Sequence, residues 1–162
     1  MQISKGVEWA AHACALLTVL PERKGLRAEA IATYLDVSGA YMAKQMQALR
    51  RGGVVASVRG QRGGYCLSRA ASDISLWDVT AAIEGHAPAF QCTEIRQQGP
   101  CGSDASRCTR PCAIAAAFHS AERAFREHLS RTSIADIAVS VLADAPPEQM
   151  EAILAWTQEN AH

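Results

Sequence analysis

Hydrophobic residues recur every three or four positions over most of this chain, which is the spacing of one face of an α-helix. Proline, glycine and polar turns interrupt the pattern and divide it into separate segments. The expected helices span residues 4–20, 28–35, 40–51, 75–85, 113–129, 134–142 and 148–156. The pattern therefore predicts a mainly α-helical protein.

One short stretch alternates apolar and polar positions instead, as β-strands do. Residues 54–58 and 65–67 have this pattern, and the glycine-rich basic segment 59–64 lies between them. Such a segment is typical of a β-hairpin. A helix, a helix-turn-helix and a basic hairpin thus follow one another in the order of a winged helix-turn-helix, so we expect a DNA-binding domain with a small β-hairpin wing.

Three consecutive parts are expected along the 162 residues, which suffice for one domain with an appendage. Residues 1–85 form the winged helix-turn-helix, residues 86–112 form a cysteine-rich loop, and residues 113–162 form a long helix followed by two shorter helices. A long helix with an apolar stripe after a small DNA-binding domain suits dimerisation. A homodimer is therefore expected.

The net charge is zero, but the charges are segregated along the chain. Residues 37–72 hold six basic residues and no acidic one, whereas residues 132–162 hold five acidic residues and no Lys or Arg. A wholly basic stretch is the footprint expected for phosphate contact, since a solvated surface normally mixes its signs. The distribution favours double-stranded DNA as a partner.

In a helix-turn-helix the N-terminal part of the third helix enters the major groove. The candidate DNA contacts around this helix are Ser38, Tyr41, Lys44, Gln45 and Arg51. Gln can read adenine edges, Lys can contact guanine, and Ser or Tyr can hold phosphates. Arg59 and Arg62, at the tip of the hairpin, are expected to reach phosphates or a neighbouring minor groove.

Four of the six cysteines fall in one stretch that begins after Pro88 and ends at the long helix. They are Cys92, Cys101, Cys108 and Cys112. Glycine, proline and serine between them predict a loop, which can wrap thiolates around a metal. Cys14 and Cys66 lie in apolar periodic contexts and are expected to be small core residues.

Composition limits the class of protein further. No apolar stretch reaches membrane length and the N-terminus lacks the features of a secretory signal, so a cytoplasmic location is expected. In a reducing cytosol six cysteines favour metal binding or redox sensing over a disulfide framework. There is no nucleophile–base set and no phosphate-binding loop in a suitable setting, so neither an enzyme nor a small-molecule substrate is expected. A metal enzyme or a cluster carrier is a remote alternative.

Three runs in the DNA-binding part carry a resemblance to a known family. They are residues 37–44 (VSGAYMAK), 49–55 (LRRGGVV) and 58–65 (VRGQRGGY). These runs closely resemble the Rrf-type bacterial regulators, the family of IscR and NsrR, and the R-G-x-x-G-G-Y hairpin is the most specific motif. Residues 6–12 (GVEWAAH) and 90–97 (FQCTEIRQ) look most like the RsrR-like redox-sensing members. The resemblance runs to about residue 142 and implies a homodimeric repressor controlled by an iron–sulfur cluster.

Glu8 and His12 are four residues apart on the first expected helix, so both project from one face and can chelate one metal ion. In the RsrR-like members a 2Fe-2S cluster is held by two cysteines of one subunit and a Glu and a His of the other. The resemblance thus implies a cluster held by Cys92 and Cys112, together with Glu8 and His12 from the partner subunit. Because the gaps between the cysteines are longer than the usual family pattern, Cys101 and Cys108 remain alternative ligands.

Two sensing chemistries remain open for the regulator. In the leading hypothesis it binds an operator and senses redox state or nitric oxide through the 2Fe-2S cluster. In the alternative it keeps the DNA-binding role, and a zinc site or a thiol–disulfide switch replaces the cluster.

Overall fold

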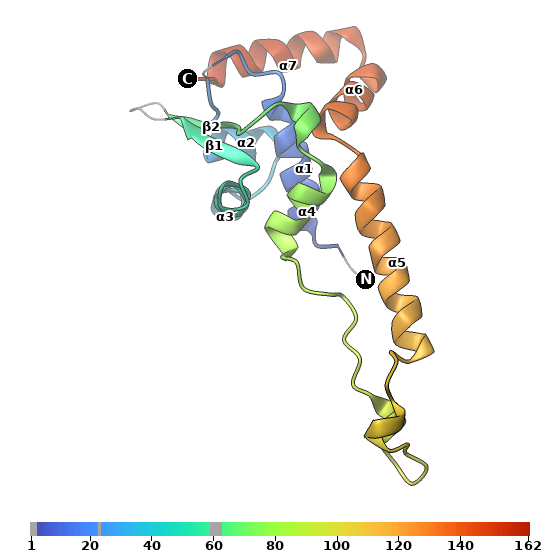
Figure 1. Cartoon of the computed structure of the whole chain (residues 1–162). Helices are drawn as coiled ribbons and strands as arrows, with labels where there is room; N and C mark the ends of the chain where they lie inside the picture. Colours follow the sequence, from blue (N-terminus) through green and yellow to red (C-terminus); the bar gives the residue numbers. More distant parts are fainter. Residues whose placement is uncertain (1–2, 23, 59–62) are drawn as a thin grey trace. The chain divides into compact units, whose positions relative to one another are not determined.

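The computed structural model describes residues 3–22, 24–58 and 63–162 (Figure 1). Its helices and strands are α1 (Lys5–Leu17), α2 (Ala28–Tyr34), α3 (Gly39–Arg51), β1 (Val55–Val58), β2 (Gly64–Leu67), α4 (Leu76–Glu84), α5 (Ala113–Arg131), α6 (Ile134–Asp144) and α7 (Pro147–Asn160). β1 and β2 pair antiparallel, from Val55 opposite Leu67 to Val58 opposite Gly64. The predicted mainly α-helical fold with one hairpin is confirmed. None of the helices described is long and apolar enough to cross a membrane.

The chain forms two compact units. The first, called here the DNA-binding unit, consists of the described residues up to Gly85 together with Leu129–His162. The second, called here the loop unit, is His86–His128 and contains the cysteine loop and most of α5. The expected boundary after residue 85 coincides with a boundary between the units. However, α6 and α7 join the DNA-binding unit instead of forming one part with the long helix.

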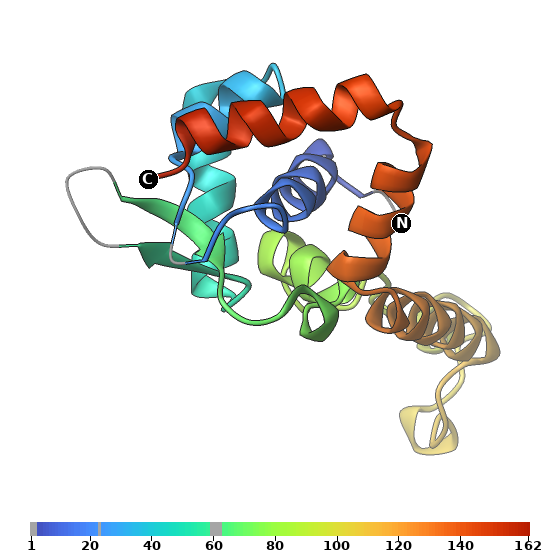
Figure 2. The same cartoon turned by 90° about the horizontal axis from the view of Figure 1, so that it is seen from above.

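The core of the DNA-binding unit is built around α1, which packs against α3, α4 and α6 (Figure 2). Ala10, Ala13 and Cys14 are completely buried on α1, and Met42 and Met46 are completely buried on α3. Their spacing places each set on one helix face, as the hydrophobic pattern predicts. Burial also raises the pKa of the Cys14 thiol to about 12, which fits its expected role as a core residue.

Helix α1 ends at Leu17, three residues before the expected end. The Thr18 hydroxyl donates to the Ala15 carbonyl at 2.7 Å, and the Thr18 backbone N–H is directed to the Ala15 and Leu16 carbonyls. Threonine competes for backbone acceptors in this way and is β-branched, so it favours the end of a helix over its interior.

Helix α3 ends in the expected manner, because Gly53 adopts a left-handed conformation with φ of 71°. At its start Ser38 occupies the N-cap position, but its side chain makes no capping hydrogen bond. The start of α4, by contrast, is held by a side chain. The carboxylate of Asp78 accepts a hydrogen bond from the Ser75 backbone N–H at 2.8 Å and one from Arg69 at 3.0 Å. Arg69 also donates to the Gly53 carbonyl at 2.8 Å, so this basic side chain stabilises the fold.

Gly52 lies where α3 meets α4. A Cβ at this position would lie 2.6 Å from the Ala82 Cβ, whereas a Cβ at Gly39 would meet nothing within 4 Å. We expect Gly52→Ala to lower the free energy of unfolding by about 1–3 kcal/mol through overpacking. Gly39→Ala, the matched control, should leave it unchanged or raise it by up to about 1 kcal/mol. Urea denaturation followed by circular dichroism measures both, and equal stability of the two variants would contradict the α3–α4 packing.

Candidate functional site

Helix α3 presents a polar face to solvent. Ser38, Tyr41, Lys44 and Arg51 are all exposed on or beside this helix. The turn that leads into α3 contains Asp36 in a left-handed conformation, with φ of 51°, and the Val37 N–H donates to the Ala32 carbonyl at 2.9 Å. Asp tolerates this conformation better than most residues, which explains why the chain can reverse here. The four candidate contacts therefore lie on an accessible helix-turn-helix surface.

Gln45 does not share this surface. Its side chain is only 4% exposed, and a Cβ at Gly6 would lie 3.2 Å from the Gln45 amide nitrogen. The glycine on α1 thus leaves just enough room for the amide between α1 and α3. The expectation that Gln45 reads base edges does not fit this burial, because the amide packs against α1 and faces away from the exposed side of α3.

The two strands of the predicted wing pair as expected. Gly63 is the first described residue after the tip of the wing, and Tyr65 lies in β2. Arg59 and Arg62, the two expected wing contacts, lie outside the described residues. They stay predictions.

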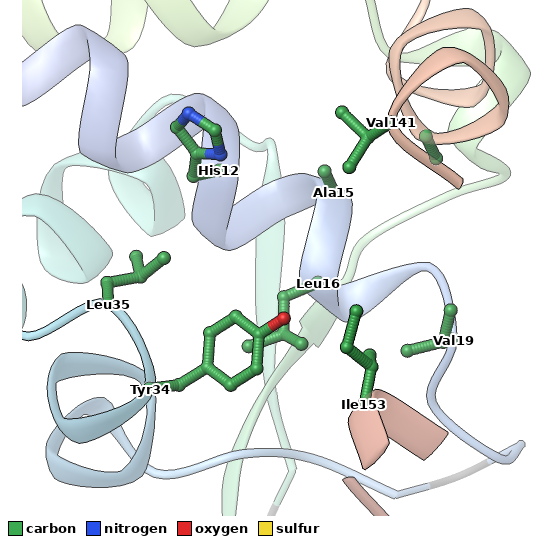
Figure 3. A pocket seen from close by; sticks show the side chains of 9 residues that line it. His12, Ala15, Leu16, Val19, Tyr34, Leu35, Val141 and Ile153 are labelled. Atoms are coloured by element: carbon green, nitrogen blue, oxygen red, sulfur yellow. The ribbon is translucent and has the colours of Figure 1, made fainter. Parts of the chain in front are cut away.

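The outer face of α1 carries Glu8 and His12, both exposed and one turn apart as expected from their spacing. Figure 3 shows His12 at the edge of an apolar pocket of about 60 Å³ whose lining includes Leu35 and Val141. Trp9, beside Glu8, makes an edge-to-face contact with Tyr41 of α3, with ring centroids 4.9 Å apart and an interplanar angle of 84°. This contact joins the helix that carries two candidate ligands to a candidate DNA contact.

In the loop unit, a hydrogen bond from Arg96 to the Arg110 carbonyl joins the two arms of the cysteine loop, and an ion pair with Glu94 orients Arg96. Arg96 donates to one carboxylate oxygen of Glu94 through Nε at 3.2 Å and Nη2 at 2.8 Å, and Nη2 also donates to the Arg110 carbonyl at 2.9 Å. Glu94 follows Cys92 by two residues, and Arg110 precedes Cys112 by two residues. Glu94 adopts a left-handed conformation, with φ of 50°, which the surrounding hydrogen bonds hold in place.

The two cysteines that the resemblance singles out lie beside each other. The Cys92 thiol donates to Glu94 at 3.5 Å. A backbone hydrogen bond from Glu94 lowers the pKa of Cys92, but desolvation, the Glu94 carboxylate and a hydrogen bond with the Cys112 thiol outweigh it and raise the pKa. The Cys112 sulfur accepts from the Ala115 backbone N–H at 3.2 Å, at the N-terminus of α5. This hydrogen bond places the Cys112 sulfur at the first turn of α5.

The other two loop cysteines are placed differently. Cys101 is exposed, whereas Cys108 is half-buried. Hydrogen bonds to Glu94 are the main reason why the pKa of Arg96 is raised, and the charges of Cys108 and Cys112 add to this effect. Cys108 is therefore the alternative ligand whose electrostatic surroundings resemble those of Cys112. All six cysteines are free thiols.

Within the described part of the chain, no three potential His, Cys, Asp or Glu ligands gather into one metal site. The loop unit brings together two thiols, and α1 of the DNA-binding unit carries a carboxylate and an imidazole. Each unit thus offers half of a four-ligand set.

Two large apolar side chains are exposed in the first turns of α5. Ile114 and Phe118 are 63% and 52% exposed, although Phe118 stacks on Phe90 with ring centroids 4.6 Å apart. Arg126 and Glu122 hold the preceding segment along the same helix: Arg126 donates to the His86 carbonyl at 3.2 Å, and Glu122 accepts from the Ala89 N–H at 3.2 Å. The loop is thus anchored to α5 at both of its ends.

Comparison with known proteins assigns the family. Residues 3–140 match Rrf2, a family described as iron-dependent transcriptional regulators. The chain belongs to the Rrf2 family. YffB of Lactococcus lactis subsp. lactis, assigned as an HTH-type transcriptional regulator, is 34% identical over 138 residues, which are 85% of this chain and 87% of YffB. The Rrf-type resemblance is confirmed at the level of the family, whereas the finer likeness to the RsrR-like members stays a prediction.

Solved structures show the same Rrf2 fold. T. potens IscR superposes with a TM-score of 0.67 at 20% identity and covers 93% of this chain and 96% of its own. CymR of B. subtilis, the global cysteine regulator of that organism, superposes with a TM-score of 0.66 at 22% identity and covers 86% and 98%. These likenesses establish the winged-helix architecture, and the Rrf2 match establishes a DNA-binding transcriptional regulator.

Two contacts in this Rrf2 protein were missed from the sequence. The Trp9–Tyr41 contact joins residues 32 positions apart and depends on how α1 crosses α3. The Glu94–Arg96 ion pair joins residues two positions apart, which face each other only because Glu94 is left-handed. The burial of Gln45, by contrast, had a signal: positions 42, 45, 46 and 49 share one helical face, and the other three are apolar.

Because the Glu94–Arg96–Arg110 contacts join the two arms, we expect Arg96→Ala to separate Cys92 from Cys112. Oxidation of this pair to a disulfide by diamide in the metal-free protein should slow roughly tenfold, or about 1.4 kcal/mol in activation free energy. Mass spectrometry of tryptic peptides measures the rate. Arg107→Ala, in the same loop, is the matched control and should oxidise like the wild type. An Arg96→Ala variant that also does so would show that the ion pair does not position the thiols.

Proposed function

We propose that the protein is a homodimeric repressor that senses redox state or nitric oxide through a 2Fe-2S cluster. The observation that carries this proposal is the Trp9–Tyr41 contact, because it connects the helix of Glu8 and His12 to the DNA-binding surface. The proposal goes beyond the family assignment in two respects, the cofactor and the signal. A cytoplasmic location of the protein follows from its proposed role as a repressor.

The residues present fit the proposed cluster. Two neighbouring thiols suit one iron, and a carboxylate with an imidazole one turn apart suits the other, since thiolate is the preferred ligand and His replaces it in some 2Fe-2S centres. Cys92 and Cys112 come from one subunit, and Glu8 and His12 come from the partner subunit. The divided ligand set supports this arrangement, because the described candidate ligands of neither unit gather into a site of three or more. When bound, the cluster takes up one electron or reacts with nitric oxide, and its charge changes.

A homodimer is part of the proposal. The exposed Ile114 and Phe118 on α5 form an apolar face that a second copy of the chain can cover. In this dimer the loop of one subunit would meet α1 of the other, as the divided ligand set requires.

The chain's own residues then transmit the signal. A change in charge beside Glu8 and His12 alters the preferred position of α1, and Trp9 passes this change to Tyr41 on α3. Gln45, wedged against Gly6, makes the two helices move together. A coupling of about 1–3 kcal/mol between cluster state and DNA affinity is typical of such linked sites.

A thiol–disulfide switch is the second candidate, and the adjacency of Cys92 and Cys112 favours it. Two neighbouring thiols can form a disulfide when an oxidant accepts their two electrons and two protons. This candidate retains the DNA-binding role and gives Glu8 and His12 no function.

The spectrum of the anaerobically purified protein separates the two candidates. We expect a brown protein whose dithionite-reduced form gives the electron paramagnetic resonance signal of a mixed-valence 2Fe-2S cluster. Cys92→Ala and Cys112→Ala should lose the cluster, because a lost thiolate leaves one iron with an incomplete ligand set. Glu8→Gln and His12→Ala should shift the spectrum without unfolding the protein, whereas Glu29→Gln, an exposed acid on α2, should not. A colourless protein that iron and sulfide cannot reconstitute would favour the switch.

The Trp9–Tyr41 contact gives a test of signal transmission. We expect Trp9→Leu to retain the spectrum but to lose most of the difference in DNA affinity between oxidised and reduced protein, about tenfold for a coupling of ~1.4 kcal/mol. Fluorescence anisotropy with a duplex selected from a random pool by the wild-type protein measures this difference. Trp77→Leu on α4 is the control and should keep it. If Trp9→Leu keeps the full difference, the signal travels by another route.

A further inference from the structure

Helix α7 lies beyond the family match, which ends at residue 140, and the proposed function does not use it. It is nevertheless part of the DNA-binding unit. Trp156 packs against Tyr34 of α2 with ring centroids 4.9 Å apart, and Thr157 is 1% exposed. Figure 1 shows that the end of α7 leads back toward the β1–β2 hairpin.

The residues after α7 are hydrogen-bonded to the segment before α2. The Gly25 N–H donates to the His162 carbonyl at 2.9 Å, and the His162 N–H donates to the Gly25 carbonyl at 3.0 Å. Lys24 Nζ adds a hydrogen bond to the Ala161 carbonyl at 3.4 Å. Reciprocal bonds of this kind join neighbouring strands of an antiparallel sheet.

The same segment is hydrogen-bonded to the wing on its other side. The Leu26 N–H donates to the Tyr65 carbonyl at 3.0 Å, and the Tyr65 N–H donates to the Leu26 carbonyl at 2.8 Å. Backbone hydrogen bonds therefore run from His162 through Gly25 and Leu26 to β2, and from β2 to β1. Leu26 is completely buried, so this connection is anchored in the core.

Two glycines allow the backbones to come so close. A Cβ at Gly64 would lie 2.5 Å from the carbonyl carbon of Leu26, and a Cβ at Gly25 would lie 3.0 Å from the carbonyl carbon of Gly64. The second glycine of the Gly-Gly-Tyr sequence in the wing is therefore explained by close packing. It allows the segment 24–26 to pair with the edge of β2 that does not pair with β1.

We propose that α7 and the residues after it position the wing for DNA. A two-stranded hairpin alone is marginally stable, and its orientation is poorly fixed without further packing. The pairs Leu26–Tyr65 and Gly25–His162 place the segment of Gly25 and Leu26 between β2 and the C-terminal residue, so that β2 is tied to the core and, through this segment, to the end of α7. The strands of the wing then meet the duplex in one orientation, which lowers the ordering cost at the moment of binding. Residues 147–162 are positioning residues for DNA binding and do not themselves contact the duplex.

One backbone hydrogen bond allows a matched test. His162→Pro removes the N–H that donates to Gly25, whereas His162→Ala removes the same side chain and keeps the N–H. Ala161 has φ of −81° and ψ of 134°, which a following proline accepts. Trp156→Ala, which loosens the docking of α7, forms a second pair with Leu154→Ala, whose side chain is 40% exposed.

Two measurements apply to all four variants of the full chain. Hydrogen exchange monitored by NMR should quicken at the Leu26 and Tyr65 amides in His162→Pro and Trp156→Ala, and remain unchanged at Met46. Anisotropy with a fluorescein-labelled random-sequence duplex should show about threefold to tenfold weaker binding and a salt slope reduced by roughly the contribution of one phosphate contact. His162→Ala and Leu154→Ala should behave as the wild type in both measurements.

A different pair of results would overturn the proposal. If His162→Pro and Trp156→Ala lower the melting temperature but leave the Tyr65 exchange and the salt slope at wild-type values, the C-terminal segment only stabilises the fold. If Trp156→Ala does not fold, the His162 pair decides alone, since it leaves α7 intact. A wild-type protein that does not bind the duplex would count against DNA binding itself, and the exchange measurement would still decide whether the C-terminal segment holds the wing.

Discussion

The burial of α1 between α3, α4 and α6 is the constraint on which the rest of the structure depends. Its inner face is made of small side chains, Ala10, Ala13 and Cys14, which let neighbouring helices approach closely. Gly6 likewise lets α3 approach α1, because the Gln45 side chain of α3 occupies the space that a larger residue at position 6 would need. Since interiors this dense deform little, a displacement of α1 must be shared by α3. In the proposed function, the exposed outer face of α1 would bind a ligand, and its packed inner face would transmit that event to α3.

The charge segregation along the chain acquires a structural meaning in the same unit. The acidic C-terminal segment folds back onto the DNA-binding unit through α6 and α7, but its contacts there are apolar or made by the backbone, as the Trp156–Tyr34 packing shows. The basic residues of α3 thus keep their charge for a partner. Arg69, a basic residue that follows β2, differs from them, because Asp78 and the Gly53 carbonyl engage it within the fold.

The presence of each helix was predictable because burial follows the helical period, but the ends were less so, since α1 stops three residues before the expected residue 20 and α7 runs four residues past the expected residue 156. Positions fixed by long-range packing were not predictable, such as the placement of α6 and α7 with the DNA-binding unit. The pattern around Met42, Met46 and Leu49 was sufficient to place Gln45 in the core, yet its chemistry favoured a DNA contact. The type of each candidate ligand followed from the sequence. The Glu94–Arg96 pair did not, because a left-handed glutamate leaves no signal in residue spacing.

The divided ligand set has a consequence for how such a sensor responds. When thiols on a loop and a Glu–His pair on α1 are brought together only by a second subunit, cluster binding and dimerisation stabilise each other by mass action. In the proposed sensor, loss of the cluster would therefore also weaken the dimer, and a dimer binds two half-sites more tightly than a monomer binds one. A change in the proposed cluster would in this way alter operator occupancy through two routes, the position of α1 and the population of the dimer.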